Sequence, residues 1–496
     1  MDHDLDYGDV QGLVRFGYKS MTQASYALAR VRSAEAARAW LRSAPVTSAT
    51  FLSPPPSTAM QVSFTAPGLQ ALGLGAPALA AFSPEFLGGM ADDSRARRLG
   101  DVGENAPSRW QWGGAGKVPH VLAMFFAEPG RLGGFVEGTT GSAWRDAFGD
   151  VHWLETGTLR PVEAFGFADG ISQPEIDWSR QRDVAVRRTT FGNVVALGEF
   201  LLGYRNEYDK YTDRPLLDEG ASTAGLPAAE DAPEKKDLGR NGTYLVMRQL
   251  RQDVRGFWQF VSRQAGGDVA EAEKLAAAFV GRTRAGYPLA PLGSEPIPGI
   301  GPRSGEVRLN QFTYDEDPAG VRCPIGAHVR RANPRNADYP GRPSGLARLL
   351  ADLGFGRKGF LDDLTSSVRF HRILRRGREY GAPLPPEEAL EPAPADDPEL
   401  GLHFACLNAN ICRQFEFVQN AWMTSAKFSG LDGENDPLVG SREAMAGCPA
   451  ADGFTVPQEG GLPRRVSGLP QFVTVRGGAY FFLPGLRALR YLAGAE

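Results

Sequence analysis

The chain has 496 residues, of which 42% are hydrophobic and 23% charged, an ordinary composition for a protein with a sizeable core. Its net charge of −4 gives no electrostatic reason to expect binding to nucleic acid or to an anionic membrane surface. The sequence contains no run of about eighteen apolar residues, so we expect no segment that crosses a membrane.

The N-terminus and the cysteines indicate a cellular compartment. Residues 1–9 are acidic and lack the basic and apolar regions of a signal peptide. The cysteines form no CxxC pair and indicate no disulfide framework; they are Cys323, Cys406, Cys412 and Cys448. We therefore expect a cytoplasmic protein.

The first part of the chain alternates between predicted strands and helices. Ser33 is a plausible N-cap, and Met60, Val62 and Phe64 alternate with polar residues as in a half-buried strand. Strands are predicted at residues 26–31, 60–64 and 121–126, and helices at residues 33–41 and 67–74. This mixture predicts an α+β sheet with helices on one face.

Residues 219–239 are small, polar and charged, a composition typical of a flexible insert. We place a domain boundary there, between residues 235 and 236. Beyond it, strands are predicted at residues 243–248 and 472–482, helices at residues 254–261, 270–280 and 346–353, an apolar-rich segment at residues 402–407, and a proline-rich surface loop at residues 383–398.

The most distinctive stretch is CPIGAHVRRANPR, residues 323–335. Its imidazole, His328, could ligate a metal, while the arginines that follow could hold anionic groups. Haem requires that combination, an axial ligand for iron and cations for two propionates. The alternative is a loop histidine bonded to backbone with solvated arginines, which is the commoner use of a lone histidine.

Two further stretches, GFADGISQP at residues 166–174 and RILRRGREYG at residues 372–381, complete a pattern with AHVRRANPR. Together they resemble the dye-decolourising peroxidase family, haem enzymes that use hydrogen peroxide, whose GxxDG motif matches residues 166–170. The resemblance also covers DVQG at residues 9–12 and FVTVRGGAYFFL at residues 472–483, and so spans nearly the whole chain. It implies two ferredoxin-like units, residues 1–235 and 236–496, enclosing one haem b per chain.

The resemblance also implies roles for individual residues. His328 would be the proximal iron ligand, Asp169 the distal acid–base group and Arg375 the distal arginine. The implied haem contacts are Gly170, Ile171, Ser172, Asn333, Pro334 and Arg335, with Arg330 and Arg331 as alternatives for pairing with propionates. His371 is the rival to His328, and Arg372, Arg376 and Arg378 lie near enough to Arg375 to compete with it.

Two consequences follow for the chemistry. An aspartate with an ordinary pKa near about 3.9 is ionised at neutral pH and protonated in acid, so we expect activity that favours acidic pH. Relatives often carry aspartate at the position of Asn410, where a carboxylate would bond to the proximal imidazole. If Asn410 bonds to the proximal imidazole instead, that hydrogen bond has an uncharged acceptor. Glu416 is the alternative hydrogen-bond partner of the imidazole.

The expected function is one-electron oxidation of an aromatic reductant, a phenol or a dye, by hydrogen peroxide. The alternatives are a haem-binding or haem-delivery protein with incidental peroxidase activity, and a ferredoxin-like protein with no cofactor. We expect neither a nucleic-acid nor a membrane partner, and a homo-oligomer stays open. A bulky dye would deliver its electron to a surface aromatic residue, for which Trp110, Trp112 and Tyr380 are the candidates.

Overall fold

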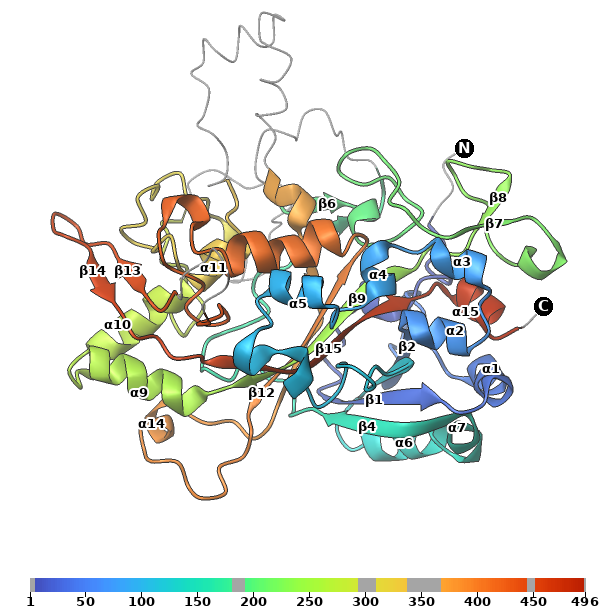
Figure 1. Cartoon of the computed structure of the whole chain (residues 1–496), viewed down its shortest axis with the longest axis horizontal. Helices are drawn as coiled ribbons and strands as arrows, with labels where there is room; N and C mark the ends of the chain where they lie inside the picture. Colours follow the sequence, from blue (N-terminus) through green and yellow to red (C-terminus); the bar gives the residue numbers. More distant parts are fainter. Residues whose placement is uncertain (1–4, 181–191, 293–308, 337–366, 444–450, 495–496) are drawn as a thin grey trace, which may run out of the picture.

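The protein is described by a computed structural model over residues 5–180, 192–292, 309–336, 367–443 and 451–494. Its centre is a nine-stranded antiparallel sheet that runs across the whole molecule (Figure 1). The strands are β1 (Gln23–Val31), β2 (Thr58–Phe64), β3 (Val121–Ala127), β4 (Phe148–Glu155), β9 (Thr243–Gln252), β10 (Leu374–Arg375), β11 (Arg378–Tyr380), β12 (Gly401–Asn408) and β15 (Val473–Leu483).

Helices and short strand pairs surround this sheet. The helices are α1 (Ala34–Ser43), α2 (Ala66–Ala71), α3 (Ala76–Ala80), α4 (Pro84–Gly88), α5 (Asp93–Leu99), α6 (Leu132–Thr139), α7 (Ser142–Ala147), α9 (Val254–Gln264), α10 (Val269–Val280), α11 (His328–Ala332), α14 (Pro386–Ala389) and α15 (Leu486–Leu492), with π-helices η8 (Cys412–Glu416) and η9 (Val418–Met423). The short pairs are β5 (Glu175–Asp177) with β6 (Val194–Ala196), β7 (Leu216–Asp218) with β8 (Lys235–Asp237), and β13 (Phe454–Val456) with β14 (Arg464–Val466).

The strand order shows the same arrangement twice. The sheet runs β10-β12-β9-β15-β2-β3-β1-β4, so each group of four strands lies in the order second, third, first, fourth along the chain. This is the order of a ferredoxin-like unit, and it confirms the predicted α+β class with two such units. The units join where β15 pairs with β2, with Phe482 opposite Phe64.

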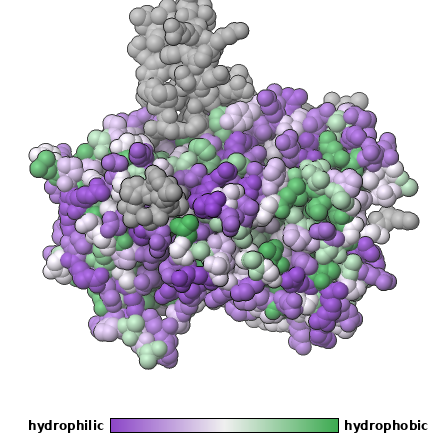
Figure 2. All heavy atoms as spheres, viewed as in Figure 1, coloured by the Kyte–Doolittle hydropathy of each residue, from purple (hydrophilic) through white to green (hydrophobic). Residues whose placement is uncertain are grey.

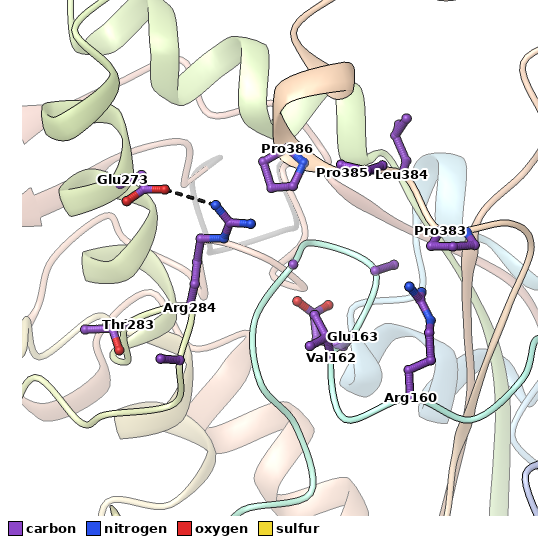
Figure 3. A pocket seen from close by; sticks show the side chains of 13 residues that line it. Arg160, Val162, Glu163, Glu273, Thr283, Arg284, Pro383, Leu384, Pro385 and Pro386 are labelled. Atoms are coloured by element: carbon purple, nitrogen blue, oxygen red, sulfur yellow. Dashed lines mark hydrogen bonds and ion pairs between the residues drawn. The ribbon is translucent and has the colours of Figure 1, made fainter.

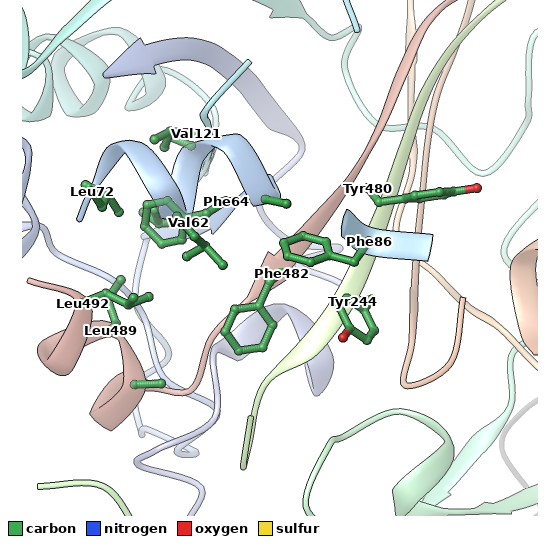
Figure 4. Packing of buried hydrophobic residues seen from close by; sticks show 14 of the residues in the cluster. Val62, Phe64, Leu72, Phe86, Val121, Tyr244, Tyr480, Phe482, Leu489 and Leu492 are labelled. Atoms are coloured by element: carbon green, nitrogen blue, oxygen red, sulfur yellow. The ribbon is translucent and has the colours of Figure 1, made fainter. Parts of the chain in front are cut away.

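A shared core holds the two units together. Val62, Phe64 and Val121 of the first unit pack in one cluster with Tyr244 and Phe482 of the second (Figure 4). The predicted boundary between residues 235 and 236 stays a prediction.

The stretch predicted to be a flexible insert has local structure. Strand β8 lies within it and pairs with β7, which comes just before it, and Arg214 forms ion pairs with Asp231 and with the buried Asp237. Charged residues of this stretch thus have partners that hold it in a defined conformation.

Both faces of the sheet are buried. In β3, Val121, Ala123 and Phe125 contribute to the core cluster that contains the helices, while Leu122 and Met124 face a second cluster. The second face is covered largely by irregular segments from the N-terminus and from residues around Phe200. Helices on one face are therefore confirmed.

The half-buried character predicted for β2 is wrong. Gln61, expected to face solvent, is completely buried. Its amide donates to Tyr18 Oη and to the Thr47 carbonyl, and its oxygen accepts from the Leu13 N–H. A polar residue in an alternating pattern can lie in the core when every hydrogen bond is satisfied.

Most other local predictions are confirmed. Ser33 caps α1 by accepting a hydrogen bond from the Ala36 N–H, and each predicted strand and helix in the described parts overlaps an element of the same type. The helix predicted at residues 346–353 lies outside the described residues. No helix within the described ranges is both long and apolar enough to cross a membrane. Hydrophilic residues cover most of the face in Figure 2, with smaller apolar areas between them.

Candidate active site

A cavity of about 310 Å³ is lined by residues from both halves of the chain, from Leu99 to Pro174 and from Arg248 to Val475. Apolar side chains form much of its wall, among them Phe165, Phe167, Leu250 and Phe404. Three of the sequence-predicted polar residues, Asp169, His328 and Arg375, line the same space. Apolar walls with a few convergent polar groups are typical of a small-molecule or cofactor site.

His328 begins helix α11, and close packing fixes this helix in place. Gly281 ends helix α10 with φ +92°, and a Cβ there would lie 2.5 Å from Val329. A glycine is therefore required where α10 meets the segment that carries the histidine.

The ring of His328 is held by a buried carboxylate. Its Nδ1 lies 3.0 Å and 3.2 Å from the two carboxylate oxygens of Asp436, whose side chain is completely buried. Asp436 also accepts hydrogen bonds from the Leu438 and Val439 N–H groups. Because an ionised carboxylate only accepts, Nδ1 carries the proton and Nε2 keeps its lone pair on the cavity side.

Charge pairing accounts for the pKa shifts of both partners. Burial lowers the pKa of His328, but the charge of Asp436 and its hydrogen bond together outweigh burial, and the pKa is raised overall. Burial raises the pKa of Asp436, but His328 and the backbone donors outweigh it and the pKa is lowered. The pair therefore holds a negative carboxylate against the ring, which orients a histidine ligand and increases its basicity.

Neither sequence candidate for this partner is correct. Asn410 caps the local turn by accepting a hydrogen bond from the Arg413 N–H. Glu416 pairs with Arg95 and accepts from Tyr480 Oη. Asp436 lies 108 residues beyond His328, and only the turn sequence Asn-Asp-Pro around it could have drawn attention to it.

Asp169 and Arg375 form an ion pair on the cavity wall. The guanidinium Nη1 donates to Asp169 Oδ1 at 3.1 Å, and both side chains stay more than one-third exposed. Arg375 comes first among the causes that lower the pKa of Asp169, ahead of burial, which raises it. The carboxylate therefore remains ionised to a more acidic pH than an ordinary aspartate.

Backbone contacts fix the relative position of this pair. Gln173 accepts from the Arg375 N–H at 3.1 Å and donates to the Arg375 carbonyl at 3.2 Å. Arg375 also donates to the Ser172 carbonyl. Gly166 and Gly170 have φ +92° and +74°, as the sequence indicated for the GxxDG turn.

The structure separates Arg375 from two neighbouring arginines. Arg376 donates to the Leu13 and Val14 carbonyls, and Arg378 donates to the Tyr18 carbonyl. Both therefore anchor the N-terminal segment. Arg372 does line the cavity, and it donates to the side chain of Asn193.

Arg330 and Arg331, the sequence alternatives for binding propionates, are not on the cavity wall. Arg330 donates to backbone carbonyls of Cys323 and Asp317. Arg331 donates to the Trp422, Ser425 and Glu434 carbonyls and is completely buried. These guanidinium groups join loops together away from the cavity wall, and their pairing with propionates stays a prediction.

Other predicted contacts do line the cavity. Ile171, Ser172, Asn333 and Arg335 are part of its wall, whereas Gly170 and Pro334 are not among the wall residues. Asn333 Oδ1 is buried without a hydrogen-bond partner among the described residues. Burial lowers the pKa of Arg335 to about 9, so an anion in the cavity would stabilise its charge. Sequence reasoning missed Arg248 and Arg282, two further buried arginines on this wall.

His371 also lines the cavity, but its surroundings differ from those of His328. Its Nδ1 donates to the Arg413 carbonyl, and its ring stacks on Phe417 with centroids 3.6 Å apart. Burial lowers its pKa to about 4. It therefore lacks the anionic partner that His328 has.

The surface aromatics expected from sequence are buried. Trp110 is 1% exposed and donates to the Asn105 carbonyl, and Trp112 is 3% exposed and donates to Gln249. Tyr380 donates to Glu399 and stacks on His403. Tyr208, by contrast, is 48% exposed and stacks on Phe370, the residue before His371.

Comparisons with known proteins agree on one family. The chain is 27% identical over 462 residues to a dye-decolorizing peroxidase of Mycetinis scorodonius, covering 88% of this chain and 76% of that one. It is 30% identical over 350 residues to the multifunctional dye peroxidase DyP2 of an Amycolatopsis species, covering 67% of this chain and 61% of that one. No protein-family model matches the chain.

Solved structures share the fold. A DyP-type peroxidase of Auricularia auricula-judae superimposes with a TM-score of 0.71 at 23% identity, covering 99% of this chain and 100% of that one. A DyP-type peroxidase of Anabaena gives a TM-score of 0.69 at 22% identity, covering 98% and 94%. Sequence relatives and fold agree with the motifs around His328 and Asp169, and together they match the chain to the dye-decolorizing peroxidases.

Proposed function

We propose that this peroxidase binds one haem b in the cavity through His328 and uses hydrogen peroxide to oxidise phenolic or dye-like substrates in one-electron steps. The observation that carries the proposal is that one cavity combines a carboxylate-backed imidazole with a carboxylate–guanidinium pair. The carboxylate-backed imidazole is what ligation of haem iron requires. The carboxylate–guanidinium pair is what acid–base chemistry on peroxide requires.

The wall residues suit haem. Aromatic and aliphatic side chains would cover the porphyrin faces, and His328 Nε2 would ligate the iron. Arg335 and Arg282 are buried cations on the wall, and Asn333 has a buried oxygen with no partner among the described residues. The positive charges of Arg335 and Arg282 would stabilise a bound group that carries carboxylates. These two arginines are our candidates for the propionate contacts.

The protein's own groups would divide the work. Haem supplies the iron that binds peroxide and accepts its oxidising equivalents. Asp169 takes a proton from the bound peroxide and returns it to the departing oxygen, acting first as base and then as acid. Arg375 keeps Asp169 ionised beforehand and stabilises negative charge as the O–O bond breaks.

A haem-binding or haem-delivery protein is the second candidate. It would need His328 and Asp436 but has no use for the ion pair of Asp169 and Arg375. The test is to load the protein with haem and follow peroxide-dependent oxidation of a phenol in wild type and in Asp169→Asn. Haem binding without any difference between the two proteins would favour the delivery function.

A further inference from the structure

A second cavity, of about 660 Å³, lies beside the one described above. Its walls come from the loop that leads into the GxxDG turn, from helix α10 and the segment after it, and from the proline-rich segment at residues 383–386 (Figure 3). Ala285 and Pro383 on its wall are exposed, so the cavity is open to solvent. Its volume lies within the range of small-molecule sites.

The two cavities share a thin wall. Glu163 lines both of them, and its carboxylate accepts from the Phe165 and Phe167 N–H groups. Those two phenylalanines line the first cavity. A Cβ on Gly166 would lie 3.1 Å from Pro386, so the proline segment lies directly on this loop. A ligand in the second cavity would thus be one layer of chain away from the first.

The charges around the second cavity leave one cation without a counterion. Arg284 is neutralised by Glu273 at 3.0 Å and Glu387 at 3.4 Å. Arg160 makes no hydrogen bond or ion pair with any described residue, and its guanidinium points toward Pro383 in Figure 3. Glu379 lies near enough to sense the charge of Arg160 but forms no ion pair with it.

The remaining carboxylate on this wall is only weakly anionic. Burial raises the pKa of Glu163 to about 7, although the Phe165 and Phe167 N–H groups act to lower it. At neutral pH its negative charge is therefore partly lost, and Arg160 dominates the local potential. Its guanidinium is suited to a planar carboxylate.

The opposite side of the cavity is apolar and rigid. Pro383, Pro385 and Pro386 border the space above Val162 and Glu163 (Figure 3). Proline rings lose little entropy when a ligand packs on them, and a flat apolar ring matches them in shape. The complementary ligand is an aromatic ring that carries one carboxylate.

We propose that this cavity binds a phenolic carboxylate as a reducing substrate, with its carboxylate on Arg160 and its ring against the prolines. The inference rests on the proposed peroxidase function. The bound phenol loses one electron across the Glu163–Phe167 loop to the enzyme's peroxide-oxidised centre, and its hydroxyl proton passes to water at the cavity mouth. The product is a phenoxyl radical with its carboxylate intact.

Equilibrium binding tests the site without turnover. Isothermal titration of the haem-loaded protein, in the absence of peroxide, compares 4-hydroxybenzoate with the neutral 4-hydroxybenzyl alcohol. We expect Arg160→Gln to weaken 4-hydroxybenzoate binding about tenfold, as for loss of a charged hydrogen bond, and to leave the alcohol unchanged. Arg131→Gln, an exposed arginine on the N-cap of α6, is the matched control and should change neither affinity.

A second variant tests the location. Ala285→Trp places a bulky ring on the exposed rim and should abolish binding of 4-hydroxybenzoate. Unchanged affinity in Arg160→Gln or in Ala285→Trp, or equal weakening by Arg131→Gln, would overturn the proposal. Failure of the wild type to oxidise the small phenol guaiacol would instead contradict the peroxidase function, because guaiacol carries no carboxylate for Arg160.

Discussion

The carboxylate behind His328 and the ion pair on the cavity wall are held in opposite ways. Asp436 is completely buried and bonded to His328 and to two backbone N–H groups. Asp169 and Arg375 keep 41% and 36% of their side-chain surface exposed. A buried carboxylate cannot turn away without leaving donors unsatisfied, whereas an exposed ion pair can exchange partners at little cost. The molecule therefore combines a fixed imidazole, our proposed iron ligand, with an exposed carboxylate, our proposed acid–base group.

The largest expected effect comes from removing the fixed ligand. His328→Ala should lose haem or bind it in a much altered state, because the Asp436 carboxylate then has no ligand to orient. Haem content and the Soret band measure this directly. His371→Ala is the control on the same cavity and should keep a normal band. If His328→Ala kept a normal Soret band and His371→Ala lost it, the iron ligand would be His371 rather than His328.

Removing Arg375 breaks the exposed pair. Arg375→Leu should slow the peroxide step by about 10²–10³-fold while haem stays bound. It should also change the pH dependence. Asp169 acts as a base only when ionised, so the rate falls as the pH drops through its pKa. Arg375 holds that pKa below its usual value, and its loss should move the acid limb to higher pH. Stopped-flow rates between pH 3 and 7 would show this shift. An acid limb at the same pH in Arg375→Leu and wild type would refute the effect of Arg375 on the pKa of Asp169.

Removing Asp436, the buried partner of His328, should have a smaller effect on haem binding than removing His328 itself. Asp436→Ala should weaken haem binding by about 10–100-fold, as is typical when the partner of a histidine ligand is lost. The rate of haem transfer to apomyoglobin measures the change. Asn410→Ala serves as the control, because Asn410 makes no contact with His328 and only caps a turn. Equal haem loss from both variants would show that the effect is structural rather than specific to the ligand.

The smallest effect concerns bulky dyes. Tyr208 is exposed and stacks on Phe370 with ring centroids 4.1 Å apart, next to His371 on the cavity wall. Tyr208→Phe should lower turnover of a large anthraquinone dye several-fold and leave the peroxide step unchanged. Trp112→Phe, at a buried position, should leave dye turnover unchanged. If only Trp112→Phe lost dye turnover, the residue that accepts the electron from the dye would be Trp112 rather than Tyr208.

The sequence predicted those parts of the site that lie in contiguous motifs. His328, Asp169 and Arg375 are each surrounded by special residues, and all three line one cavity. Asp436 could not be found in this way, since its contact with His328 depends on folding across 108 residues. The carbonyl partners of Arg330 and Arg331 could not be predicted either, because sequence shows a charge but not which carbonyls it bonds.

The fold was predictable for similar reasons. Apolar runs such as β3 and capped helices such as α1 are local signals, and they gave the α+β class. The burial of Gln61, Trp110 and Trp112 was not predictable, because it depends on partners brought from elsewhere in the chain. Polar neighbours of a tryptophan in sequence therefore say little about its exposure in the fold.

The most direct test of the account compares Asp169→Asn with the wild type by stopped-flow mixing with hydrogen peroxide. Both proteins are first matched for haem content and Soret band, so that binding through His328 is equal. We expect the spectral change after mixing to be slower in Asp169→Asn by about 10²–10⁴-fold, the usual contribution of proton transfer. Equal rates in the two proteins would contradict the role of Asp169 as the acid–base group.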